Sequence, residues 1–80
     1  MPRHDLCLPD LGIDDQPIVL SLWLAKEGSR VAEGDQVVEV LCGGATVDLP
    51  APAEGMLIAT LVEEGDSLAV GQRLAVFESL

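Results

Sequence analysis

Basic side chains are scarce in this chain. Its 80 residues include four Lys and Arg residues against fourteen Asp and Glu residues, so the formal net charge is −10 at pH 7. Such a surface repels phosphate backbones and anionic lipid headgroups over at least a Debye length, about 8 to 10 Å at physiological salt. We therefore expect neither a nucleic-acid partner nor binding to an anionic membrane.

The residue types that build catalytic and metal sites are equally sparse. His4 is the single histidine, and the two cysteines, Cys7 and Cys42, lie 35 positions apart with no C-x-x-C spacing. This set indicates neither a zinc site nor a disulfide framework, so we expect no metal and two free thiols. No Ser-His-Asp or Cys-His combination is available, and one histidine near the terminus is a poor general base. We expect no active site in this chain.

Long apolar runs are also missing. The longest uncharged and mostly apolar stretch, Pro17 to Ala25, falls far short of the roughly 20 residues that a transmembrane helix needs. The first residues, Met1 to Asp5, lead into patterned sequence without an apolar segment or a small-residue cleavage site. These features predict a cytoplasmic protein with reduced cysteines and no membrane span.

Only two aromatic residues, Trp23 and Phe77, accompany a hydrophobic content of 49%. The core must therefore be aliphatic, and eighty residues are enough for one small domain. We expect Trp23 to be a half-buried packing residue, since tryptophan is usually well covered but seldom fully buried.

What the chain does contain is an internal repeat. After a shift of 37 positions, residues 20–40 match residues 57–77 in leucines, turn glycines and other positions. The identical pairs are Leu20/Leu57, Leu24/Leu61, Glu27/Glu64, Gly28/Gly65, Ala32/Ala69 and Gly34/Gly71. Two copies of one supersecondary unit predict a pseudo-two-fold domain in which each half covers the apolar face of the other. We expect functional residues at the seam between the halves.

Strand patterns dominate the chain, and no segment sustains a helical period. Short apolar or alternating runs are bounded by Gly, Pro or Asp clusters, and prolines mark the strand ends. The expected strands are 6–8, 18–24, 36–41, 46–49, 56–61 and 73–77, with very short strands at 30–31 and 67–68. The sequence thus predicts an all-β fold of about eight short antiparallel strands.

A hairpin is predicted at the seam, within residues 37–49. Two β-rich runs flank Gly43-Gly44, and glycine reaches positive φ at both central positions of a two-residue turn without steric cost. Gly43-Gly44 is the expected tip.

Six short motifs spread over the chain carry a family resemblance. They are Leu8-Pro9-Asp10-Leu11-Gly12, Lys26-Glu27-Gly28, Glu33-Gly34-Asp35, Val47-Asp48-Leu49-Pro50-Ala51-Pro52, Glu64-Gly65-Asp66 and Val70-Gly71-Gln72. Together they resemble the lipoyl domain of 2-oxo acid dehydrogenase acyltransferases, within the biotinyl/lipoyl carrier family. The resemblance covers residues 5–78 of a single domain, 1–80. It implies a flattened barrel of two four-stranded antiparallel sheets related by a quasi-dyad, and a swinging-arm role.

The same resemblance implies that a key lysine is absent. In that family the hairpin tip carries the lysine that accepts lipoate or biotin, eight residues before the proline that is Pro52 here. Counting back reaches Gly44, so we expect neither lipoate nor biotin on this chain. Residues 41–43 also depart from the usual Glu-Thr-Asp, and Lys26, the only lysine, lies at a turn that the family leaves unmodified.

Three functions are compatible with this pattern. The first is a non-enzymatic docking or assembly module that has lost its modification, related to the acyltransferase component of 2-oxo acid dehydrogenase complexes. The second is a working carrier that uses Cys42 or another covalent route, and the third is a structural adaptor of a larger chain.

The first function implies a protein partner, such as a 2-oxo acid dehydrogenase-type or ligase-type enzyme, and a monomer in isolation. The expected contact surface is the hairpin tip with the loop that the resemblance places beside it, and its scarcity of basic groups favours a basic partner surface. The surface comprises Gly12, Ile13, Asp14, Asp15, Gln16, Cys42, Gly43 and Gly44.

Overall fold

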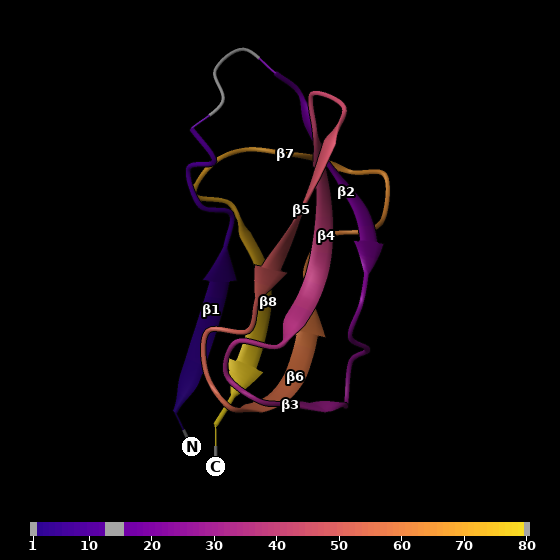
Figure 1. The fold of residues 1–80 in the computed structure, drawn as a ribbon. Helices are drawn as coiled ribbons and strands as arrows, with labels where there is room; N and C mark the ends of the chain where they lie inside the picture. Colours follow the sequence, from indigo (N-terminus) through magenta and orange to yellow (C-terminus); the bar gives the residue numbers. More distant parts are fainter. Residues whose placement is uncertain (1, 13–15, 80) are drawn as a thin grey trace.

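The computed structural model describes residues 2–12 and 16–79, which form eight strands in two four-stranded antiparallel sheets (Figure 1). The strands are β1 (Arg3–Cys7), β2 (Ile18–Trp23), β3 (Arg30–Val31), β4 (Gln36–Cys42), β5 (Ala45–Pro50), β6 (Gly55–Thr60), β7 (Ser67–Leu68) and β8 (Arg73–Glu78). Sheet A has the order β1-β8-β6-β3, and sheet B has the order β5-β4-β2-β7. The predicted all-β architecture is confirmed. Among the described residues, no helix is long and apolar enough to cross a membrane.

The first strand differs from its prediction at both ends. β1 begins at Arg3 and ends at Cys7, whereas the expected run is 6–8. Leu8 leaves the ladder because its N–H donates to the Gln72 carbonyl (2.9 Å) and its carbonyl accepts from the Gly71 N–H (2.8 Å). Both partners belong to the turn between β7 and β8, so Leu8 joins β1 to the other end of the chain.

Backbone hydrogen bonds repeat with the period of the sequence. The N–H of Gly28 donates to the carbonyl of Leu57 (2.7 Å), and 37 positions later the N–H of Gly65 donates to the carbonyl of Leu20 (2.8 Å). The two glycines have φ values of 87° and 93°, a region that L side chains rarely adopt. Each half therefore binds the other through an equivalent turn, as the predicted pseudo-two-fold symmetry requires.

The short strands cross between the halves. β3, from the first copy of the repeat, pairs with β6 of the second copy, and β7, from the second copy, pairs with β2 of the first. Figure 1 shows these two strands at opposite ends of the molecule. Each sheet is thus completed by a strand from the other copy.

Two glutamates fasten the equivalent connections. The Oε2 atom of Glu27 accepts from the N–H of Thr60 (2.7 Å), and that of Glu64 accepts from the N–H of Trp23 (3.0 Å).

We expect Glu27→Ala and Glu64→Ala each to lower the free energy of unfolding by about 1 kcal/mol, or ~4 to 8 °C in Tm. Thermal unfolding measures this. Glu63→Ala removes the same charge beside Glu64 and is the control; an equal loss there would contradict the assignment.

The core lies between the sheets and is aliphatic apart from one ring. The largest side chains that are fully buried are Phe77, Leu8, Leu20, Leu57, Leu74, Val37, Val38, Val40 and Cys42. Trp23 is half-buried at the edge of this core, and its indole Nε1–H donates to the carbonyl of Val62 (3.1 Å). The packing role predicted for Trp23 is confirmed.

Candidate functional site

The β4–β5 hairpin ends in a two-residue turn. Cys42 and Ala45 are the last paired residues, so Gly43 and Gly44 alone form the tip, which Figure 1 shows projecting at one end of the molecule. Their φ values are 59° and 91°, positive at both central positions as a type I′ turn requires. The prediction of a Gly-Gly tip is confirmed, and its conformation is one that depends on glycine.

The connection between β1 and β2 reaches this tip. A Cβ atom placed on Gly43 would lie 2.9 Å from Oε1 and 3.2 Å from Cδ of Gln16. Gln16 therefore packs against the turn, where the resemblance puts it. Gly12 lies exposed earlier in the same connection, with its N–H donating to Oδ1 of Asp10 (2.8 Å). The predicted contact residues Ile13, Asp14 and Asp15 lie outside the described residues.

Gly44 faces open space. A Cβ atom at this position would have no heavy atom within 4 Å, apart from its chain neighbours. A side chain there would have room, although at a φ of 91° an L residue would be strained.

The tip does not fit an amide-linked prosthetic group. Glycine has no side-chain amine, and the single lysine, Lys26, lies exposed in the connection between β2 and β3. That connection runs toward the end of the molecule opposite the hairpin tip (Figure 1).

Cys42 does not contribute to the predicted contact surface. Its side chain is only 1% exposed and belongs to the core, because every second residue of β4 after Val38 points inward. The expectation that Cys42 lies at the surface beside the tip is wrong. Both cysteines are free, as expected, with Cys7 exposed on β1.

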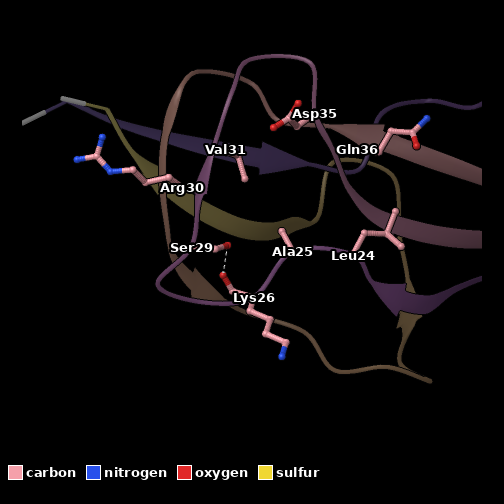
Figure 2. Close-up of a pocket in the computed structure, with 8 residues that line it drawn as sticks. All are labelled: Leu24, Ala25, Lys26, Ser29, Arg30, Val31, Asp35 and Gln36. Carbon is pink, nitrogen blue, oxygen red and sulfur yellow. Dashed lines mark hydrogen bonds between the residues drawn. The ribbon is translucent and has the colours of Figure 1, made fainter.

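An open hollow lies away from the tip. It is an open depression of about 600 Å³ beside the connection from β2 to β4, lined by Leu24, Ala25, Lys26, Ser29, Arg30, Val31, Asp35 and Gln36 (Figure 2). The charged ends of Lys26 and Arg30 point away from each other in Figure 2, and Asp35 Oδ2 already accepts from the N–H of Ala32 (2.9 Å). Its polar groups do not converge on a ligand. Within the described residues, no three His, Cys, Asp or Glu side chains are grouped to hold a metal ion.

The sequence and the fold both have known counterparts. The family model described as "Biotin-requiring enzyme" matches residues 4–77. This chain belongs to the biotin/lipoyl family. It is 33% identical over 78 residues to the lipoamide acyltransferase component of the branched-chain alpha-keto acid dehydrogenase complex of Pseudomonas putida, covering 98% of this chain and 18% of the relative.

A second relative is also an acyltransferase component of a dehydrogenase complex. This chain is 33% identical over 72 residues to the dihydrolipoyllysine-residue acetyltransferase component of the pyruvate dehydrogenase complex of Bacillus subtilis. The match covers 90% of this chain and 16% of the relative. The chain therefore spans less than a fifth of either relative.

Solved structures of the biotin/lipoyl fold superpose closely. The lipoyl domain of the 2-oxoglutarate dehydrogenase complex from Azotobacter vinelandii gives a TM-score of 0.75 at 21% identity, covering 94% of this chain and 96% of that domain. A single-chain long-chain acyl-CoA carboxylase gives a TM-score of 0.78 at 22% identity, covering 98% of this chain and 7% of the carboxylase. The flattened two-sheet fold implied by the resemblance is confirmed.

The sequence contains only a weak signal for one feature of the surface, a pair of acidic residues on neighbouring strands. A two-residue turn at 43–44 fixes the hairpin register, and that register sets Glu39 opposite Asp48. Counting outward from the predicted tip is the signal that reveals two like charges side by side.

Proposed function

We propose that this chain is a lipoyl-type domain without an attached prosthetic group, which serves as a docking or assembly module. The observation that carries the proposal is the Gly43-Gly44 turn, since the tip where the family holds its acceptor lysine offers no amine. We assign no catalytic activity to the domain itself.

The relatives support a partner of a particular kind. They are named as acyltransferase components of branched-chain alpha-keto acid and pyruvate dehydrogenase complexes, so we propose that the partner is an enzyme of a 2-oxo acid dehydrogenase-type system. The contact surface would centre on the tip and on Gln16, which packs against it. The burial of Cys42 disfavours a carrier that uses this thiol.

The unmutated chain is expected to gain no mass from lipoyl or biotin ligase. After incubation with each ligase, its cofactor and ATP, intact-mass spectrometry should find only the unmodified protein, because the one lysine lies in the connection from β2 to β3 and not at the tip. A lipoylated relative treated in parallel is the positive control. A lipoyl-sized or biotin-sized gain on the unmutated chain would sink the proposal.

A further inference from the structure

The outer face of sheet B combines exposed leucines with acids that form no ion pair within the part of the chain that the structure describes. Along β4, Val40 and Cys42 point into the core, while Leu41 is 40% exposed and Glu39 half-buried. On the neighbouring β2, Leu22 is 45% exposed. Neighbouring apolar side chains on a solvent-facing sheet surface, unlike single ones, mark a place where another molecule can bind.

Strand register arranges these side chains in two rows. One row runs across β5, β4 and β2 as Asp48, Glu39 and Leu22, and the adjacent row as Thr46, Leu41 and Val19. Glu39 also accepts a hydrogen bond from the Ser21 hydroxyl at its Oε1 atom (3.2 Å). The acidic pair, Glu39 and Asp48, therefore lies beside the apolar pair, Leu22 and Leu41, on the outer face of sheet B.

The acidic pair is unfavourable as it stands. Glu39 and Asp48 are direct cross-strand partners, and like charges directly opposite each other destabilise a sheet. None of the strands of sheet B contains Lys or Arg. An external cation would relieve the repulsion that the fold leaves in place.

The outer face of sheet A provides an internal comparison. There the acids are compensated, since Arg3 Nε lies 3.4 Å from Glu78 Oε2 and an Arg73 guanidinium nitrogen lies 3.5 Å from Asp5 Oδ2. All three arginines of the chain lie on strands of sheet A. The two sheets of the pseudo-symmetric molecule thus differ in the charge of their outer faces.

We propose that the outer face of sheet B docks a basic protein segment, with an arginine or lysine between Glu39 and Asp48 and an apolar side chain against Leu22 and Leu41. This deepens the docking role proposed above and rests on it. Charge complementarity selects the occupant, because a guanidinium fork can contact two carboxylates at once. Leu41 lies two residues before Gly43, so this surface continues from the tip.

The test is an NMR titration of the ¹⁵N-labelled chain with a capped pentapeptide of alternating leucine and arginine. A peptide with glutamine in place of arginine is the matched probe. We expect amide shifts on β2, β4 and β5 from the arginine peptide, and affinity for the glutamine peptide lower by about tenfold or more.

Two double variants separate the local surface from net charge. Glu39→Gln with Asp48→Asn should weaken binding of the arginine peptide by about five- to tenfold. Glu33→Gln with Glu54→Gln removes the same charge from exposed turns and should change binding by less than about twofold. Equal weakening by both would overturn the proposal. Shifts confined to Gln16 and the tip would also overturn it, while leaving the docking role at the tip intact.

A single variant distinguishes docking from a structural role. Asp48→Lys replaces a like-charge pair by an opposite-charge pair, which should raise Tm by about 2 to 6 °C and weaken binding of the arginine peptide. A lower Tm, or unchanged binding, would contradict the assignment. Ligase-dependent mass gain is measured separately, so the failure of the proposed function is distinguishable from the failure of this surface.

Discussion

Replacing Gly44 with lysine is expected to turn a chain that lipoyl ligase leaves unmodified into one that it modifies. The new amine would stand at the outermost point of a two-residue hairpin, where no heavy atom outside the two adjacent residues lies within 4 Å of its Cβ. Incubation with lipoyl ligase, lipoate and ATP, followed by intact-mass spectrometry, should show a single lipoyl-sized gain on Gly44→Lys.

Backbone strain limits how complete this gain will be. At a φ of 91° a lysine costs about 1 to 2 kcal/mol relative to glycine, so the turn must either carry that strain or change its type. In the double variant Gly43→Asp with Gly44→Lys, both turn residues favour negative φ, so the turn is driven to change its type, at the cost of moving the flexible end of Gln16. We expect the double variant to be modified faster than Gly44→Lys alone.

The control is a lysine in a different glycine turn. Gly34 has a φ of 89° and an equally open Cβ position, so Gly34→Lys introduces the same amine with the same strain away from the hairpin. It should stay unmodified. Modification at Gly34→Lys, or none on either Gly44 variant, would contradict the assignment of the tip as the attachment position.

Phe77→Ala is expected to remove most of the stability of the domain. Phe77 is fully buried, lies on β8 between His4 of β1 and Leu57 of β6, and is the single aromatic ring inside the core. Phe→Ala changes in cores cost about 3 to 5 kcal/mol, which is close to the total stability of a domain of this size, about 5 kcal/mol. Urea unfolding followed by tryptophan fluorescence measures the loss.

The pseudo-symmetry supplies a matched control for this substitution. Val40 occupies the equivalent position on β4 and is also fully buried, but it fills less volume. Val40→Ala should cost clearly less than Phe77→Ala, and Phe77→Leu should cost the least because the volume is largely kept. If Phe77→Ala cost no more than Val40→Ala, the ring would not be the main filling of the core.

The internal repeat predicts most of the fold. Matching glycines at 28/65 and 34/71 indicate the turns from the sequence alone, and a Gly-Gly pair between β-rich runs indicates the hairpin with its register. The turns are predictable because few residues other than glycine adopt φ values near 90°. The end of β1 is not predictable, because Leu8 pairs with a turn more than sixty residues away and no local pattern encodes that contact.

The candidate site is less predictable than the fold. Adjacency to the tip favours a surface position for Cys42, yet this residue lies two positions beyond the inward-facing Val40, and the period of two along a strand sends it into the core. Family resemblance supplies the meaning of Gly44. The residues around Gly44 do not themselves show that a lysine is missing, so only comparison with a family reveals the loss.

The crossing of β3 and β7 makes the two halves of the chain inseparable. An isolated half would leave one of its own strands without a partner and its apolar face open to water, so neither half can be an independent folding unit. Five of the six strand pairings join strands that are not consecutive in the chain, which predicts slow, all-or-none folding for so small a protein. Two separate copies of one half could build this interior only as a domain-swapped homodimer, whose folding depends on protein concentration. When the two copies are fused into one chain, folding no longer depends on concentration.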